Sequence, residues 1–272
     1  MVDFPMAELL HADLTYYLRG AGFHIQNKLG SGHDEKDYEQ ALVYKLEADG
    51  IFFQRQARYT LTYRGKQIGE YYPDLTLADG KVQLDLKAAP SITGLHKAQL
   101  LSYLAVTRAE LGFLMNFGAA SMQYERLPNF LSNRQRKPAP SPPQGLLYPE
   151  LTTPLLQALH TVYFTLGPGF LHQIYRRATR IELREAGLNS AYVKELPLSY
   201  AGQVIATKAT RLFWVEEKLL VATVAFRQIL PAHEDKLRWA MRTLDCPLGL
   251  IANFYPTQLG VHFLRVKAAG GG

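Results

Sequence analysis

The chain is poor in cysteine and lacks long hydrophobic runs. Cys246 is the one cysteine among 272 residues, so no internal disulfide can form and no cysteine-rich zinc site can be built. No apolar stretch approaches the ~18 residues that a membrane span requires. The N-terminal segment has neither the basic start nor the apolar core of a signal peptide. We therefore expect a soluble, cytoplasmic protein of a reducing compartment, with no membrane association.

Acidic residues are scarce in the second half of the chain. Residues 1–128 carry 13 Lys and Arg against 15 Asp and Glu, and residues 150–272 carry 14 against 9. The intervening residues 129–149 add three basic groups and no acid, which brings the net charge to +6. A positive second half suits contact with a polyanion such as nucleic acid. A surface of this charge is also common in proteins that bind no nucleic acid.

A proline-rich, basic segment divides the chain into two similar halves. Residues 128–145, PNFLSNRQRKPAPSPPQG, predict an extended, semi-rigid linker because they lack periodic apolar residues. A shift of 137 residues aligns Leu29–Phe117 with Leu166–Phe254 without a gap. The matching pairs include Tyr38 with Tyr175, His96 with His233 and Asn116 with Asn253. The sequence is therefore interpreted as a tandem duplication.

The duplication predicts two domains, each of a size that folds independently. We expect a first domain at residues 1–128, a linker at 129–149, a second domain at 150–267 and a disordered tail at 268–272. Each copy places strand patterns beside helical patterns. This arrangement predicts two tandem α/β sandwich domains, each a small mixed sheet flanked by helices.

The expected elements follow the same order in both copies. Helices of the first copy are expected at Met6–Arg19, Asp34–Asp49 and Thr93–Thr107. Its strands are expected at Phe52–Thr62, Lys66–Leu77, Val82–Ala88, Leu111–Phe117 and Met122–Leu127. The first two helices of the second copy are expected at Leu151–Phe164 and Phe170–Glu185.

A hairpin at residues 72–87, YPDLTLADGKVQLDLK, carries two carboxylates and a lysine. Asp79-Gly80 indicates a two-residue turn, which pairs residues whose numbers add to 159 and places Asp74 opposite Asp85. Their Cβ atoms would lie about 4.5–5.5 Å apart, and Lys87 would share their face.

Two carboxylates at this separation require a compensating group. At about 5 Å they repel by about 3 kcal/mol at an effective dielectric of 20, whereas cross-strand pairing supplies only about 0.2–1 kcal/mol. A cation or one shared proton would hold the pair, and all-oxygen ligands favour Mg²⁺ or Mn²⁺ over zinc. A solvated surface hairpin with unpaired acids is the alternative interpretation.

Three further polar residues are candidates for the same site. Glu35 lies near the start of the second helix, where the helix dipole also favours an acid for structural reasons. Gln99 and Tyr103 are four residues apart, so they share one face of the helix that follows the hairpin. Their amide and phenol groups could bind phosphate or a base edge, or could be structural.

Taken in order, these residues resemble a known family. Gly32-x-x-Glu35-x-x-Tyr38, Pro73-Asp74, Asp85-x-Lys87 and Asn116-Phe117-Gly118 resemble the GxxExxY family, which is assigned to the PD-(D/E)XK nuclease superfamily. Gln99-x-x-x-Tyr103 also resembles the Gln-x-x-x-Tyr element of RecB-type exonucleases in that superfamily. The resemblance covers essentially all of the first copy. One departure is Asp85, where this family more often has glutamate.

The resemblance implies a restriction-endonuclease-like fold for each copy and a divalent-metal-dependent nuclease that hydrolyses phosphodiester bonds of DNA. The implied ligands of Mg²⁺ or Mn²⁺ are Glu35, Asp74, Asp85 and the Leu86 carbonyl. Lys87 would orient or deprotonate the attacking water and stabilise the charge that grows on the phosphate. Gln99 and Tyr103 would position the nucleic-acid strand.

The second copy has lost these residues. Glu35, Asp74, Asp85, Lys87, Gln99 and Tyr103 are replaced, in order, by His172, Arg211, Ala222, Val224, Lys236 and Ala240. Residues that both copies keep are expected to serve the fold, so His96 is not assigned to catalysis. Arg176, Arg180 and Arg184 recur every four residues on a helix of the second copy. This basic stripe either contacts a phosphate backbone or is a solvated helix face.

Two functions are therefore open from the sequence. The first is a nuclease whose second copy is a basic pseudo-nuclease lobe that binds nucleic acid or completes an internal pseudo-dimer. The second is a catalytically inactive scaffold that binds nucleic acid or a protein. Convergence of Glu35, Asp74, Asp85 and Lys87 in space would favour the first.

Overall fold

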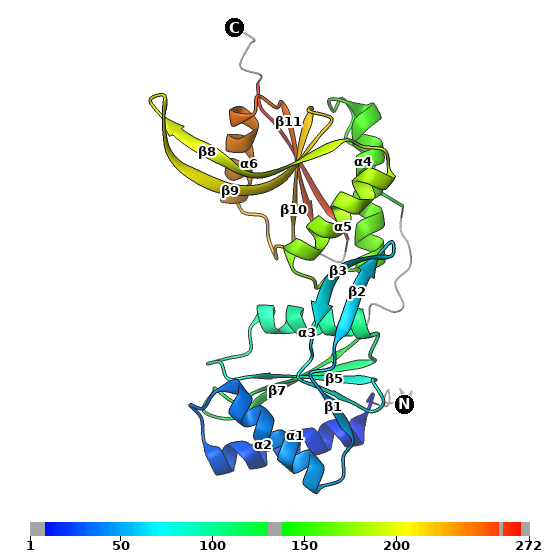
Figure 1. Ribbon diagram of the computed structural model, residues 1–272, viewed down its shortest axis with the longest axis vertical. Coiled ribbons are helices and arrows are strands. Elements are labelled where there is room, and N and C mark those ends of the chain that lie inside the picture. The colour runs from blue at the N-terminus through cyan, green and yellow to red at the C-terminus, as the bar shows by residue number, and fades with distance from the viewer. Residues whose placement is uncertain (1–8, 130–137, 256–257, 268–272) are drawn as a thin grey trace, which may run out of the picture. The chain divides into compact units, whose positions relative to one another are not determined.

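The computed structural model describes residues 9–129, 138–255 and 258–267 (Figure 1). Part of the expected linker, residues 130–137, and the expected tail at 268–272 lie outside the described residues. No helix in the described part of the chain is long and apolar enough to cross a membrane.

The chain divides into two compact units, and each contains one five-stranded sheet. The first unit consists of the described residues up to Thr62 together with those from Gly69 to residue 129. Residues 63–68 and the described residues from 138 onward form the second unit.

Three helices cover the sheet of the first unit. α1 (Ala12–Leu29) and α2 (Glu35–Ala48) lie against one face, and α3 (Gly94–Thr107) lies against the other (Figure 1). The main core is enclosed between the first two helices and the sheet and includes Leu18, Tyr38, Leu42, Leu84 and Leu86. A smaller apolar cluster joins α3 to the opposite face.

The sheet of the first unit is small and mixed. Its strands, in spatial order, are β1 (Phe53–Arg55), β4 (Leu75–Leu77), β5 (Val82–Lys87), β6 (Leu111–Asn116) and β7 (Gln123–Pro128). β5 and β6 are parallel, and the other neighbours are antiparallel. A separate two-stranded hairpin is made by β2 (Tyr59–Tyr63) and β3 (Lys66–Tyr71). Helices on both faces of a mixed sheet confirm the predicted α/β sandwich.

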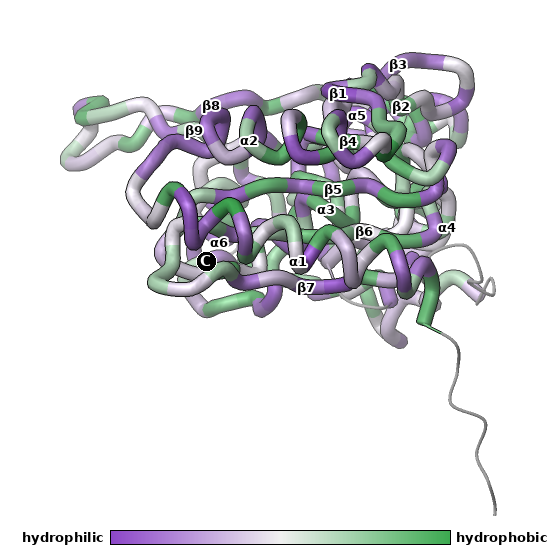
Figure 2. Tube along the Cα trace, turned by 90° about the horizontal axis from the view of Figure 1, so that it is seen from below, coloured by the Kyte–Doolittle hydropathy of each residue, from purple (hydrophilic) through white to green (hydrophobic). Residues whose placement is uncertain are grey.

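The hairpin register predicted from Asp79-Gly80 is confirmed. Leu75 pairs with Leu84 and Leu77 with Val82, so paired numbers add to 159. Asp79 and Gly80 both have positive φ, at 51° and 90°, as the predicted turn requires. The leucines of this hairpin face the core, and the tube in Figure 2 shows β5 with both hydrophobic and hydrophilic residues along its length. The polar residues of β5 alternate with them and lie on the other face.

The position of the first helix was predicted wrongly. It was expected at Met6–Arg19, but α1 begins at Ala12 and continues to Leu29; residues 6–8 lie outside the described part. Gly20 and Gly22 lie near its middle but do not end it. Gly22 lies where the helix packs closely against the sheet. A Cβ at Gly22 would collide with the side-chain ends of Met115 and Met122.

Two long strands predicted for the first copy, Phe52–Thr62 and Lys66–Leu77, are each broken in two. Gln56 has a φ of 46°, which interrupts one strand, and its amide donates to the Asp74 carbonyl at 3.0 Å. Pro73 interrupts the other, since proline has no amide for the strand ladder. The break leaves Asp74 just outside β4, at the edge of the candidate site.

The second unit repeats the first along its whole length. Its elements are α4 (Pro149–Leu166), α5 (His172–Glu185), β8 (Ser190–Tyr200), β9 (Gln203–Val215), β10 (Leu219–Val224), α6 (Pro231–Thr243), β11 (Leu248–Asn253) and β12 (Gly260–Arg265). Subtracting 137 from the bounds of α4 returns those of α1, and the same shift maps β10 onto β5. β8 covers the span of β1 and β2 as one continuous strand. The backbone therefore supports the tandem duplication.

A residue that both copies share has the same structural role in each. The Tyr38 hydroxyl donates to the carbonyl of the glycine that ends α1 at 2.8 Å, and its ring stacks on Phe117 with centroids 4.6 Å apart. Tyr175 repeats both contacts, with a hydrogen bond of 2.6 Å and a stack of 4.4 Å on Phe254. These tyrosines fix the turn between the first two helices of each copy.

Candidate active site

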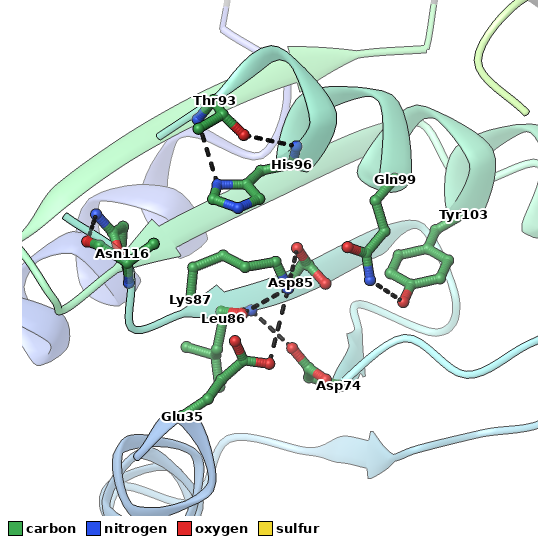
Figure 3. Close-up of polar contacts among 11 residues, drawn as sticks. Glu35, Asp74, Asp85, Leu86, Lys87, Thr93, His96, Gln99, Tyr103 and Asn116 are labelled. Carbon is green, nitrogen blue, oxygen red and sulfur yellow. Dashed lines mark hydrogen bonds and ion pairs between the residues drawn. The ribbon is translucent and has the colours of Figure 1, made fainter. Parts of the chain in front are cut away.

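The proposed chemical residues of the first copy lie together at the end of β5. Figure 3 shows Glu35 at the start of α2, Asp74 just before β4, and Asp85 and Lys87 on β5, with their side chains directed toward one another. Side chains from three separate segments thus lie close together, the arrangement that favours the first of the two functions.

Lys87 connects the acids of this site. Its Nζ lies 2.9 Å from Asp85 Oδ2 and 3.7 Å from Glu35 Oε1, and it donates to the Leu86 carbonyl at 2.8 Å. Burial alone lowers the pKa of this nearly buried lysine, but Asp85 and the other nearby carboxylates outweigh burial and raise it. Lys87 is therefore a protonated ammonium in this arrangement.

Both aspartates are held in a poorly solvated place. Asp85 is fully buried, and burial raises its pKa to about 7, against the opposing attraction of Lys87. Burial also raises the pKa of Asp74 to about 6, although its Oδ2 accepts a 2.7 Å hydrogen bond from the Leu86 amide. Near neutral pH, any positive charge that enters the site stabilises the ionised form of these carboxylates.

The donor set fits a hard divalent cation in its chemistry. All candidate ligands are oxygen atoms, which Mg²⁺ and Mn²⁺ prefer, and Asp85 Oδ1 has no hydrogen-bond partner among the described residues. As placed, no group of three or more His, Cys, Asp or Glu side chains in the described ranges could hold a metal ion. The Lys87 ammonium instead contacts Asp85, Glu35 and the Leu86 carbonyl, so cation binding requires it to withdraw from these oxygens.

The Gln99 and Tyr103 pair borders the site on α3. Gln99 Nε2 donates to the Tyr103 hydroxyl at 2.8 Å, and both side chains extend from α3 toward the β5 residues (Figure 3). Burial raises the pKa of Tyr103 to about 12, so its hydroxyl stays neutral. The two groups are held as one hydrogen-bonded unit beside Asp85.

His96 caps α3. Its Nδ1 accepts from the Thr93 amide at 3.2 Å, and its own amide donates to Thr93 Oγ1 at 3.4 Å. In the second copy, His233 Nδ1 accepts from the Leu230 amide at 3.0 Å. The shared histidines therefore start a helix in each copy, which agrees with the choice to leave His96 out of catalysis.

Sequence reasoning missed the role of Asn116. Its Oδ1 accepts from the Ala89 amide and its Nδ2 donates to the Ala89 carbonyl, both at 2.9 Å. Asn253 makes the same pair of bonds to Phe226. These amides hold the chain that leaves β5 and β10, and their presence in both copies was the available signal.

The equivalent place in the second copy is a cavity of about 300 Å³. His172, Arg211, Ala222, Val224 and Lys236, which replace site residues of the first copy, all line it. Aspartate, glutamate and the site lysine have been replaced there by cationic, imidazole and apolar side chains. The sequence identified the substitutions but not the cavity.

The three arginines predicted to contact nucleic acid line adjoining hollows along α5. Arg176 and Arg180 line one of about 350 Å³, and Arg180 and Arg184 line another of about 310 Å³. A path of positive charge therefore follows this helix from the cavity toward its C-terminal end.

Together, the mixed sandwich and the paired aspartates with their neighbouring lysine define a nuclease-like fold. The model of the PD-(D/E)XK nuclease superfamily matches residues 12–127 and, separately, residues 149–266. This chain belongs to the PD-(D/E)XK nuclease superfamily, with one copy of the fold in each matched region.

Other comparisons add little. No curated protein matches the chain. A solved structure described as "Crystal structure of SSO0001" matches 35% of this chain and 50% of its own, with 20% identity and a TM-score of 0.29. This chain thus spans half the length of that solved chain, and a likeness of this size carries no argument.

Proposed function

We propose that the protein is a divalent-metal-dependent nuclease that hydrolyses phosphodiester bonds of DNA, with the catalytic site in the first copy. The observation that carries this proposal is the meeting of Glu35, Asp74, Asp85 and Lys87 at one end of β5. All four are replaced at the equivalent positions of the second copy, so the fold does not require them. The resemblance to the GxxExxY family supports the same assignment.

The proposed ligands of Mg²⁺ or Mn²⁺ are Glu35, Asp74, Asp85 and the Leu86 carbonyl. The bound cation would activate water as a nucleophile and neutralise charge on the phosphate. Lys87, released from its contacts with these oxygens, would as an ammonium orient that water and stabilise the developing negative charge. To deprotonate the water it would first have to lose its own proton, which the loss of its carboxylate partners favours. Because Asp74 and Asp85 are buried, their ionised forms are destabilised when no metal is bound. Binding of a cation would relieve this destabilisation.

Residues beyond the ligands would hold the nucleic acid. The Gln99 and Tyr103 pair lies beside Asp85 and offers amide and phenol groups to a strand entering the site. The second copy, with its net positive charge and the arginines of α5, would act as a pseudo-nuclease lobe that contacts phosphates or forms an internal pseudo-dimer. Residues 1–128 would thus be catalytic and 150–267 would guide the substrate.

The test is cleavage of end-labelled single-stranded and double-stranded DNA in Mg²⁺ or Mn²⁺. Wild type is compared with Asp74→Ala, Lys87→Ala and Glu47→Ala, the last removing an exposed acid of α2 that lies outside the site. Metal-dependent products from wild type and Glu47→Ala alone would support the proposal. Cleavage by Asp74→Ala at the wild-type rate, or no cleavage of DNA or RNA by any form, would favour the inactive scaffold.

A further inference from the structure

The cavity of the second copy is a candidate binding site with a charge opposite to that of the first. Its wall carries Arg176, Arg211 and Lys236, and no acidic side chain lines it. In the first copy, the positions of the last two hold Asp74 and Gln99. One proposed metal ligand is thus replaced by an arginine and a neighbouring neutral residue by a lysine, which points to an anion rather than a metal as the occupant.

These three cations have no internal counter-charge. None of them forms an ion pair with a carboxylate in the described ranges. Burial lowers the pKa of the half-buried Arg176, and Arg211 lowers it further. Arg211 and Lys236 are exposed at the mouth of the cavity, so an anion can reach all three cations without their being buried first.

Arg211 has an unusual backbone as well as an unusual neighbourhood. Its φ is 55°, within β9 and next to a register shift between Val193 and Glu195 on β8. A bulge of this kind redirects a side chain, and arginine adopts positive φ only at a cost. Arg211 lines both the cavity and the adjoining hollow along α5, so the strained residue connects the two.

Apart from Thr210 and Thr223, the rest of the cavity wall is apolar or aromatic. Phe226 stacks on His233 with centroids 4.2 Å apart and meets the edge of His172 at 5.0 Å. Leu212, Leu237 and Ile251 also line the space. His172 Nδ1 accepts from the Ala225 amide at 2.9 Å, so the neutral ring carries its proton on Nε2 as a donor. Inorganic phosphate alone would leave these apolar walls uncovered, whereas a nucleoside base would cover them.

We propose that this cavity binds one nucleoside monophosphate unit, with Arg176, Arg211 and Lys236 around the phosphate and the apolar wall against the base. The unit is either a free mononucleotide or the terminal nucleotide of a strand. A volume of about 300 Å³ is at the small end of ligand sites, which suits one nucleotide and excludes a duplex. This site goes beyond the proposed catalysis and does not depend on it.

The test is calorimetric titration of the full chain with 2′-deoxyadenosine 5′-monophosphate in EDTA, so that metal-mediated binding to the first copy is absent. We expect binding that Arg211→Ala weakens at least about tenfold, the loss typical of a charge-assisted hydrogen bond. Arg242→Ala, which removes an exposed arginine of α6 away from the cavity, should bind as wild type does. If Arg211→Ala does not fold, Lys236→Gln, which restores the residue of the first copy, replaces it.

Three results would overturn the proposal: no binding to wild type, equal binding by the cavity variants, or equal affinity for adenosine or inorganic phosphate. Titration with a 5′-phosphorylated single-stranded oligonucleotide shows whether the bound unit is a free mononucleotide or the terminal nucleotide of a strand. Binding as tight as that of the mononucleotide assigns the cavity to strand ends, and binding of the mononucleotide alone assigns it to free nucleotides. Asp74→Ala, which tests catalysis, should leave this binding unchanged, so failure of one proposal is distinguishable from failure of the other.

Discussion

Replacing Asp85 with asparagine should make the metal-free protein more stable. Asp85 is fully buried, and its pKa is about 7, against 3.8 when it is unperturbed. One pKa unit corresponds to about 1.4 kcal/mol, so the ionised side chain lowers the free energy of unfolding by about 4 kcal/mol at pH 8. Asparagine keeps the shape and removes the charge. Allowing for relaxation of the site and for the ion pair with Lys87 that asparagine gives up, we expect the gain to be smaller than this, about 2–4 kcal/mol.

The stability gained by Asp85→Asn should increase with pH. Because the pKa of Asp85 is higher in the folded than in the unfolded chain, its ionisation costs nothing below about pH 4. The cost grows between pH 4 and 7 and is complete above pH 7. In EDTA, Asp85→Asn should therefore raise the melting temperature by roughly 10 °C at pH 8 and by little at pH 4.5.

Thermal unfolding followed by circular dichroism measures this effect, with Glu47→Gln as a matched control. That control removes an exposed acid of α2, and it should change stability by less than about 0.5 kcal/mol. Asp85→Asn should also lose metal-dependent cleavage. A lower melting temperature at pH 8, or a gain of equal size at both pH values, would refute the argument that Asp85 is held at an electrostatic cost.

Three further predictions address the metal, the fold and the basic lobe. Mg²⁺ or Mn²⁺ should raise the melting temperature more at pH 8 than at pH 5.5, because Asp74 and Asp85, with pKa values of about 6 and 7, must ionise to bind it; equal shifts would contradict this. Tyr38→Phe should lower the free energy of unfolding by about 1 kcal/mol, because it removes the 2.8 Å hydrogen bond of the Tyr38 hydroxyl. Urea unfolding measures this loss. Tyr44→Phe, at an exposed position, is the control and should have no effect. Replacing both Arg180 and Arg184 with alanine should reduce the salt dependence of DNA binding in fluorescence anisotropy by about two phosphate contacts; an unchanged slope would indicate a solvated face.

Local chemistry explains why much of the first copy was predictable. The positive φ required at Asp79 and Gly80 fixes the turn, and the turn fixes the register that directs Asp85 and Lys87 to one face. Asp74 lies just outside the paired strands because Pro73 interrupts the hydrogen bonding before β4. A comparison of the two copies indicates this break, since the second copy has Thr210 in place of Pro73 and its strand β9 is continuous there.

Other features depend on contacts between distant parts of the chain. The length of α1 was misjudged because Gly22 breaks a local helical pattern, yet its lack of a side chain allows close packing against Met115. The pairing of Lys87 with Glu35 depends on where the start of α2 lies relative to β5. Neither relation is encoded in local spacing.

The sequence by itself determined the duplication and the sandwich architecture, because these follow from an internal comparison and from periodicity. The acids and the lysine of the proposed site were suggested by turn chemistry together with the resemblance to a known family. Only the tertiary structure decided that Lys87 contacts the proposed metal ligands and that Asp85 is buried without a partner for Oδ1. It alone placed Arg211 at a strained position in the cavity that replaces the site in the second copy. The physical reason is that burial, charge pairing and cavities arise from segments far apart in the sequence, whose distances only the packed fold sets.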